Sequence, residues 1–132
     1  MKTITIRTIK KEEIIDITDK VEEQIPKDFS GICNVFVRHA TAAIIINENY
    51  DPNLCEDIIN CLDKLIPQGI WKHDKIDKNG AAHIKAAILG PGENIPVEKG
   101  KLKLGRWQGI GLAELDGPRE REIIINLSQK FK

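Results

Sequence analysis

Hydrophobic and polar residues alternate over the first part of the chain, which is the pattern of half-buried β-strands. The alternation runs through Thr3–Ile9, and a shorter run follows at Ile14–Ile17, so we predict two strands there. Branched residues dominate Gly31–Arg38 and Ala42–Asn47, which predicts two further strands joined across His39–Thr41. This part of the chain is therefore expected to be mainly strand.

Apolar residues switch to helical spacing in the middle of the chain. Asp51 supplies an N-cap acid, and Pro52 fits the first turn of a helix that Pro67 stops. A second helix is predicted over Gly80–Leu89, with Asn79 as its N-cap and a glycine-rich turn after it. These two helices separate the strand-like ends of the chain.

The remaining segments predict one short helix and a return to strands. The short helix is expected to begin at Thr18 or Asp19 and to end near Pro26. Asp116-Gly117-Pro118 supplies a turn before the last strand. The later predicted strands are Asn94–Glu98, Lys101–Leu104, Trp107–Leu115 and Glu122–Leu127. This order predicts an α+β fold, mainly antiparallel β-sheet with two to three helices, in one domain spanning residues 1–132.

Composition indicates a globular protein without an overall charge. Of 132 residues, 41% are hydrophobic and 30% are charged, which is ordinary for one globular domain. Lys and Arg number 20, as do Asp and Glu, so the net charge is zero, which favours self-association and gives no reason to expect nucleic acid. The N-terminus alternates instead of forming an apolar signal segment. No run approaches the roughly 20 apolar residues of a membrane span, so no membrane association is expected.

The three cysteines, Cys33, Cys55 and Cys61, match no metal-binding or redox spacing. Cys55 and Cys61 fall on different faces of the predicted helix that contains them. We therefore expect reduced thiols that behave as small hydrophobic side chains, and a cytoplasmic location.

All three histidines lie in segments that are expected to be ordered. His39 follows a predicted strand, His73 lies beside an aspartate in a polar segment, and His83 lies about one turn into the Gly80–Leu89 helix. Three imidazoles with one open position form the ligand set of a catalytic divalent metal. Each histidine alone has an ordinary alternative: a turn residue at His39, a solvated residue at His73 and a core hydrogen bond at His83.

Several short motifs follow one another along the chain. They are His39-Ala40-Thr41-Ala42-Ala43 with Asn47-Glu48, then His73, Asn79-Gly80 with His83, Leu104-Gly105 with Trp107-Gln108, and Glu114 with Asp116-Gly117-Pro118-Arg119 and Arg121. In order and spacing they resemble the YjbQ (UPF0047) family from about Gly31 to Leu127. Members of this family carry the label secondary thiamine-phosphate synthase because of a weak activity. One position departs from the family pattern, because Ala40 stands where a hydroxyl residue is usual.

The resemblance implies a compact, sandwich-like α+β fold that assembles as a homotrimer. It also implies a histidine-lined, metal-binding site with acidic and basic residues nearby. We therefore predict His39, His73 and His83 as ligands of a divalent metal. The imidazole ligands favour Zn²⁺, with Mg²⁺ as the alternative. Because Ala40 has no hydroxyl group, any hydrogen bond that such a hydroxyl would make behind the metal site is absent.

Other residues in these motifs are assigned roles by their chemistry. Glu48 is predicted to act as a general base or to orient an imidazole, the alternative being a solvated carboxylate. Thr41 and Asp116 complete the predicted catalytic set. Guanidinium groups beside a Gly-Pro turn suit a phosphate or a carboxylate, the alternative being surface ion pairs. The predicted substrate- or anion-binding residues are Arg119, Arg121, Gln108 and Asn47.

Three functions fit these features. The first is a metal-binding enzyme acting on a small phosphorylated substrate, either by thiamine-phosphate synthesis or by a hydrolase- or lyase-like reaction. The second is a non-catalytic trimeric protein that binds a metal or an anion. The third is a structural trimer whose histidines support subunit contacts. The usual ATP and nicotinamide enzymes are not expected, because the sequence contains no P-loop and no dinucleotide fingerprint.

Overall fold

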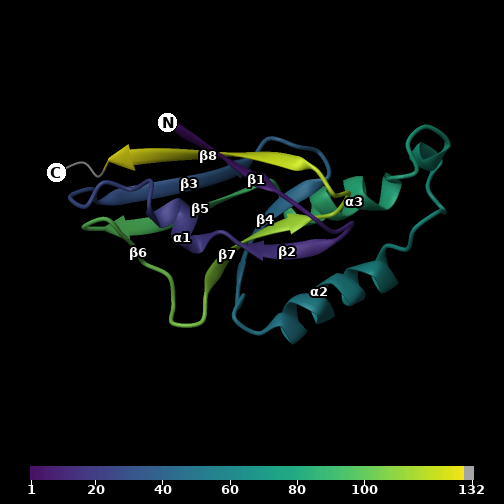
Figure 1. The fold of residues 1–132 in the computed structure, drawn as a ribbon, viewed down its shortest axis with the longest axis horizontal. Coiled ribbons are helices and arrows are strands. Elements are labelled where there is room, and N and C mark those ends of the chain that lie inside the picture. Colours follow the sequence, from purple (N-terminus) through teal and green to yellow (C-terminus); the bar gives the residue numbers. More distant parts are fainter. Residues whose placement is uncertain (130–132) are drawn as a thin grey trace.

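Two antiparallel sheets form the centre of the protein, whose computed structural model describes residues 1–129 (Figure 1). The larger sheet has the order β1-β8-β3-β5-β6, with β1 (Lys2–Arg7), β8 (Glu120–Gln129), β3 (Gly31–Val37), β5 (Gly92–Glu98) and β6 (Lys101–Leu102). The smaller sheet has the order β2-β7-β4, with β2 (Glu13–Asp16), β7 (Gly109–Glu114) and β4 (Ala42–Asn47). All these neighbours pair antiparallel, so the predicted α+β fold is confirmed.

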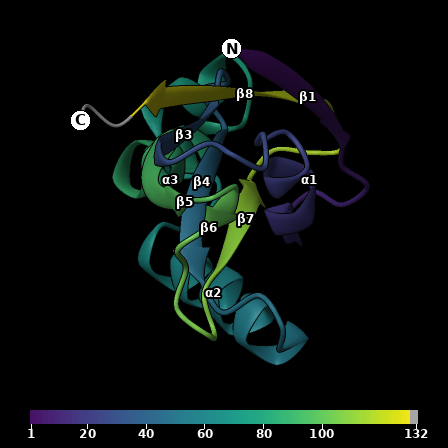
Figure 2. The same cartoon turned by 90° about the vertical axis from the view of Figure 1, so that its left-hand side faces the viewer.

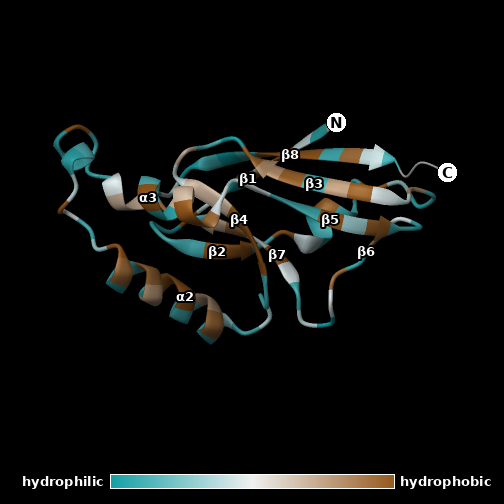
Figure 3. Cartoon of the chain, turned by 180° about the vertical axis from the view of Figure 1, so that it is seen from behind, coloured by the Kyte–Doolittle hydropathy of each residue, from teal (hydrophilic) through white to brown (hydrophobic). Residues whose placement is uncertain are grey.

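The main apolar core lies between the two sheets. Alternate residues of β3, namely Cys33, Val35 and Val37, are buried, as the two-residue period of a strand requires. They belong to one cluster with Ile44 and Leu112 of the smaller sheet. Burial follows the same two-residue period in β8 and β5, and Figure 3 shows apolar residues on both strands. β7 is buried at every position, because α3 (Gly80–Leu89) covers the side turned away from the larger sheet.

The helices lie along the smaller sheet. They are α1 (Thr18–Glu22), α2 (Pro52–Leu65), the 3₁₀ helix η1 (Lys72–Lys75) and α3. α3 packs against β4, whereas α2 packs against β2 and extends away from the sheets (Figures 1 and 2). As predicted, Asp51 caps α2, because its carboxylate accepts a hydrogen bond from the Asn53 amide at 2.9 Å. Among the described residues, no helix has the length and apolar character needed to cross a membrane.

Several strand ends differ from the sequence prediction, and at two of them a side chain or a turn intervenes. β1 ends at Arg7, earlier than predicted, where the Thr8 hydroxyl donates a hydrogen bond to Glu114 Oε2 at 2.8 Å. β7 begins later than predicted, because the Gln108 amide closes a turn onto the Gly105 carbonyl at 3.0 Å.

The start of α3 also differs from the prediction. Asn79 occupies the N-cap position, but within residues 1–129 its side chain makes no capping hydrogen bond. Asp74 of η1 takes that role, since its Oδ1 accepts a hydrogen bond from the Gly80 amide at 2.8 Å. The Asn79 side chain instead donates to Asp116 Oδ2 at 2.9 Å. Asp74 thereby ties η1, which was not predicted, to α3 and positions the histidine of each helix.

Candidate functional site

The β3–β4 turn, the start of α3 and the β7–β8 turn enclose a hollow of about 590 Å³, which we call the polar hollow. Its lining residues are His39, Ala40, Thr41, Asp77, Asn79, His83, Arg119, Glu120 and Arg121. The fold therefore brings five of the residues predicted from the sequence to one place: His39, Thr41, His83, Arg119 and Arg121.

A buried ion pair forms the wall of the polar hollow. Arg121 donates from Nε to Glu114 Oε2 at 2.8 Å and from Nη2 to Oε1 at 2.5 Å, and the two side chains are only 2% and 0% exposed. Burial would raise the pKa of Glu114, but hydrogen bonds from Arg121, the Asp116 amide and Thr8 outweigh it and hold that pKa below its usual range. Arg121 Nη2 also donates to Thr41 Oγ1 at 2.9 Å. Arg121 and Thr41 are thus held in the wall.

Asp116 is surrounded by more positive charge than it can balance. Its Oδ1 accepts from Lys11 Nζ at 2.5 Å, and its Oδ2 accepts from Asn79 Nδ2 and Arg119 Nη2, each at 2.9 Å. Burial would raise the pKa of Asp116, but these hydrogen bonds lower it to about 2. The carboxylate is therefore ionised at neutral pH, and one negative charge faces two cations. These three side chains together keep a surplus of one positive charge, and Arg119 lines the polar hollow with Arg121 and with the carboxylates Asp77 and Glu120.

Arg119 presents this surplus charge in a fixed orientation. Its Nε donates to the Asp116 carbonyl at 2.7 Å in addition to the Nη2 bond, while the side chain stays 53% exposed. A guanidinium has five N–H donors, so donors remain for an anion in the hollow. Asp116, which was predicted to be catalytic, is bonded at both oxygens and serves here to position Arg119.

His39, which also lines the polar hollow, is held as a neutral imidazole. Its Nε2 accepts a hydrogen bond from the Glu122 amide at 2.9 Å, so the proton of the neutral ring is on Nδ1. Burial lowers the pKa of His39, and the nearby charge of Arg121 lowers it further. At neutral pH the ring can therefore donate a hydrogen bond through Nδ1, as neutral histidines do toward developing negative charge.

The other two histidines contact each other. The rings of His73 and His83 meet edge to face with centroids 4.7 Å apart. His83 lines the polar hollow, and Asp77 Oδ2 lies 3.9 Å from His73 Nε2. This separation exceeds hydrogen-bond distance, and the enclosed Nε2 has no hydrogen-bond partner among residues 1–129.

The predicted three-histidine metal centre is not assembled in this arrangement. Imidazole donors suit zinc, but the Nε2 lone pair of His39 already accepts the Glu122 amide and its Nδ1 carries a proton. Within the part of the chain that the structure describes, no three His, Cys, Asp or Glu side chains are placed to hold a metal. A single chain therefore does not supply the three donors of the predicted metal centre. Of the three predicted ligands, only His73 and His83 lie in contact with each other.

Three predicted residues lie far from the polar hollow. Thr41 precedes β4, whereas Asn47 and Glu48 lie at its other end, and at the usual rise per residue that separation is roughly 20 Å. Gln108 lies at the same far end, near the exposed Trp107. The expectation that Glu48 acts beside His39 as a general base is therefore not supported within one chain.

Other contributors to the site were not predicted. Lys11 reaches Asp116 across 105 positions of sequence, and Thr8 reaches Glu114 across 106. No short motif connects segments so far apart. Asn79 was recognised only as a helix cap, although its side chain supports the polar hollow by bonding Asp116.

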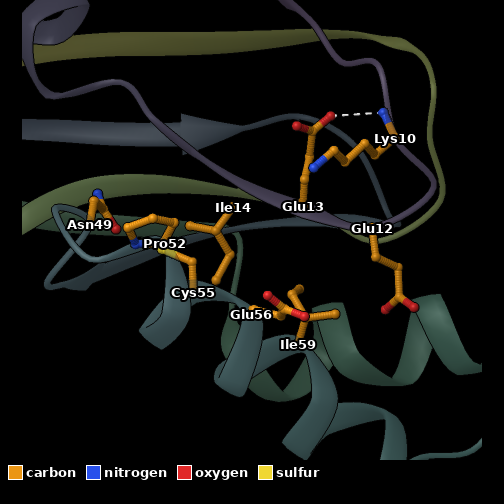
Figure 4. A pocket seen from close by; sticks show the side chains of 9 residues that line it. All are labelled: Lys10, Glu12, Glu13, Ile14, Asn49, Pro52, Cys55, Glu56 and Ile59. Carbon is orange, nitrogen blue, oxygen red and sulfur yellow. Dashed lines mark hydrogen bonds between the residues drawn. The ribbon is translucent and has the colours of Figure 1, made fainter.

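A second hollow of about 480 Å³ lies between α2 and β2 (Figure 4). It contains none of the residues predicted from the sequence, since it is lined by Lys10, Glu12, Glu13, Ile14, Asn49, Pro52, Cys55, Glu56 and Ile59. Its carboxylates outnumber its one lysine, whereas the two carboxylates of the polar hollow are matched by two arginines, so it suits an anion less well than the polar hollow.

Comparison with known proteins identifies relatives over nearly the full length. A family model described as UPF0047 protein YjbQ-like matches residues 2–130. A UPF0047 protein of Archaeoglobus fulgidus is 46% identical over 123 residues, which covers 92% of this chain and 96% of the relative. The UPF0047 protein YugU of Bacillus subtilis is 39% identical over 132 residues, covering 96% and 98%.

Solved structures agree with this relationship. A hypothetical protein from Aeropyrum pernix K1 is similar with a TM-score of 0.92 and 39% identity, over 98% of each chain. An uncharacterised conserved protein of Clostridium acetobutylicum, described as YjbQ/UPF0047 family, gives 0.91 and 40% identity over 97% of this chain and 100% of that one. The fold and the relationship expected from the motifs are thus confirmed together.

Proposed function

The chain belongs to the YjbQ-like UPF0047 family, and we propose that it is an enzyme that binds a small phosphorylated molecule in the polar hollow. The observation that carries this proposal is the surplus positive charge at Asp116, where Lys11 and Arg119 share one carboxylate. Arg119 is oriented but half exposed, which is the arrangement that binds a phosphate by paired hydrogen bonds. His39 adds a neutral donor to the lining of the same hollow.

The chemistry we propose is proton transfer by His83, with His73 behind it. Imidazole is the side chain most often used to give a proton to a departing oxygen or to take one from an attacking group. Thiamine-phosphate synthesis is the named reaction to test first. In it, a pyrimidine methyl diphosphate joins a thiazole phosphate at the ring nitrogen and releases pyrophosphate. Arg119 would hold the departing diphosphate.

A second candidate is an anion-binding protein without turnover. It is favoured by the position of Glu48, which leaves the predicted general base at the far end of β4 from His39. The homotrimer stays a prediction from the family resemblance, and the zero net charge is compatible with self-association. Sedimentation equilibrium measures the assembly directly.

Calorimetric titration with methyl phosphate tests the proposal. We expect Arg119→Ala to weaken binding about tenfold to a hundredfold, the usual effect of losing a hydrogen bond to a charged group. Arg106→Ala is the matched control, because this arginine lies over Trp107 in the Gly105–Gln108 turn. Equal binding by wild type and Arg119→Ala would refute the anion site.

Turnover then separates the enzyme from the binding protein. We expect His83→Asn to keep methyl phosphate affinity within about threefold and to lower pyrophosphate release by about a hundredfold, the range of general acid–base catalysis. Binding of phosphates without any turnover across a panel of phosphorylated substrates would favour the second candidate.

A further inference from the structure

A third, mainly apolar hollow of about 620 Å³ adjoins the polar hollow at His83. We call it the apolar hollow, and its lining residues are Ile70, Trp71, Lys72, His73, Gly80, His83 and Ile84. We propose that the two hollows form one extended site for a phosphate monoester that carries a flat apolar group, with the phosphate at Arg119 and that group against Trp71. This inference rests on the proposed function and specifies the ligand it requires.

Trp71 is built into a fixed position at the apolar hollow. Its indole Nε1 donates to the Pro67 carbonyl at 2.7 Å, and its amide donates to Asp74 Oδ2 at 3.1 Å. A Cβ at Gly80 would lie 2.7 Å from the Trp71 Cβ, so only glycine lets the tryptophan approach the first turn of α3 this closely. A large aromatic side chain fixed in this way loses little freedom when a ligand packs against it.

Side chains around Trp71 leave an apolar surface open to solvent. Ile70 is 67% exposed, and Ile84 follows His83 on α3 at the edge of the same hollow. Lys72 is the one charged residue of the lining, and its charge has the sign that suits an anionic ligand. The surface thus fits the uncharged part of an anion better than a second charged group.

The two histidines mark the junction between the hollows. His83 lines both hollows, and His73, in contact with it, lines the apolar one. His73 Nε2 is enclosed and unpaired among the described residues, which is uncommon for a buried polar atom. An ester oxygen placed between phosphate and apolar group would lie at this junction. The ester oxygen of a bridging ligand would then lie beside the imidazole nitrogens of His73 and His83.

Titration with phenyl phosphate and methyl phosphate tests the extended site. We expect wild type to bind phenyl phosphate about tenfold more tightly, since burying a ring of this size removes apolar surface from water. Ile70→Ser and Trp71→Leu should each reduce the ratio of phenyl phosphate affinity to methyl phosphate affinity toward one, while methyl phosphate affinity itself stays unchanged. Ile88→Ser is the control, because Ile88 is equally exposed at 67% and lies on α3 outside both hollows.

Tryptophan fluorescence gives a second measurement, in which the residues that line the apolar hollow are left unchanged. The chain has two tryptophans, so Trp107→Phe leaves Trp71 as the only one. Saturating phenyl phosphate should change the emission of this variant more than saturating methyl phosphate. Equal affinity for the two phosphates, with no emission difference, would overturn the extended site and leave the anion site intact. Failure of both phosphates to bind would overturn both proposals.

Discussion

Arg121 and Lys85 are both fully buried cations, with side chains 2% and 0% exposed, but their surroundings differ. Arg121 pairs with Glu114, which is itself 0% exposed. Lys85 Nζ contacts Glu12 Oε2 at 2.9 Å and Asp63 Oδ1 at 2.5 Å, and these carboxylates are 15% and 38% exposed. Arg121 is thus buried together with its partner, whereas Lys85 is bonded to carboxylates that remain partly exposed to solvent.

The clusters also differ in what they leave unbalanced. The Arg121 pair is neutral and adjoins Asp116, whose two cations exceed its single negative charge, and one of them, Arg119, lines the polar hollow. Lys85 joins α3 to α2 and to Glu12, which directly precedes β2 and which Figure 4 shows pointing in the opposite direction from Glu13. That cluster has surplus negative charge and fastens α2 to the body. A buried cation therefore indicates an anion-binding site only where its surroundings leave positive charge unpaired at a hollow.

Replacing each buried cation should show the largest difference in stability between the two clusters. Arg121→Met leaves Glu114 buried without its partner, so we expect the free energy of unfolding to fall by about 3–5 kcal/mol. Lys85→Met leaves carboxylates that can rehydrate, so we expect a smaller loss of about 1–3 kcal/mol. Urea unfolding of both variants measures the difference.

The control is the double variant Arg121→Met/Glu114→Gln. Neutralising Glu114 removes the stranded charge, so this variant should be more stable than Arg121→Met alone. A loss from Lys85→Met as large as that from Arg121→Met would show that the exposure of the partners does not decide the energetics.

Most of the fold could be predicted because each strand and helix carries its own local pattern. The alternation in β3 and the cap at Asp51 with Pro52 are complete within short segments, and the structure confirms them. η1 could not be predicted, since a four-residue 3₁₀ helix has no apolar period. Its position depends on Asp74 bonding Gly80 in the next helix, which is a tertiary contact.

The site could be predicted only in part for the same reason. The sequence identified His39, His83 and Arg119 as candidate residues, and all three line the polar hollow. It could not indicate that the Glu122 amide occupies His39 Nε2, because that bond joins segments 83 residues apart. Nor could it place Glu48 at the far end of β4, because nearness in sequence does not indicate which end of a strand faces a site.

Lowering the pH should produce a smaller difference between the stabilities that the two clusters contribute. The pKa of Asp116 is lowered to about 2 in the folded protein from 3.8, so its stabilisation is present above about pH 4 and is lost as pH falls toward 2. A shift of this size corresponds to about 2 kcal/mol at neutral pH. Urea unfolding at pH 5 and pH 2.5 should show this loss in wild type.

Asp116→Asn serves as the control for that measurement. It lacks the titrating carboxylate, so its stability should depend less on pH between these two values. The pKa of Glu12 is raised, by burial first, despite the hydrogen bond from Lys85, so protonation of Glu12 begins above its usual range. A loss of stability below pH 4 that occurs in wild type and is smaller in Asp116→Asn would therefore identify the cluster at the polar hollow.

The smallest expected effect concerns His39, whose backbone partner Glu122 follows Arg121 on β8. Because Nε2 of His39 is occupied, we expect His39→Ala to change zinc affinity less than twofold. His73→Ala and His83→Ala should each weaken it at least about tenfold, since even losing a group behind a metal ligand has that effect. Equal weakening in all three variants, measured by competition with a chromophoric chelator, would mean that His39 leaves Glu122 and joins the predicted three-histidine centre. The charge at Arg119 would then share the polar hollow with a metal, and phosphate affinity should rise when zinc is added.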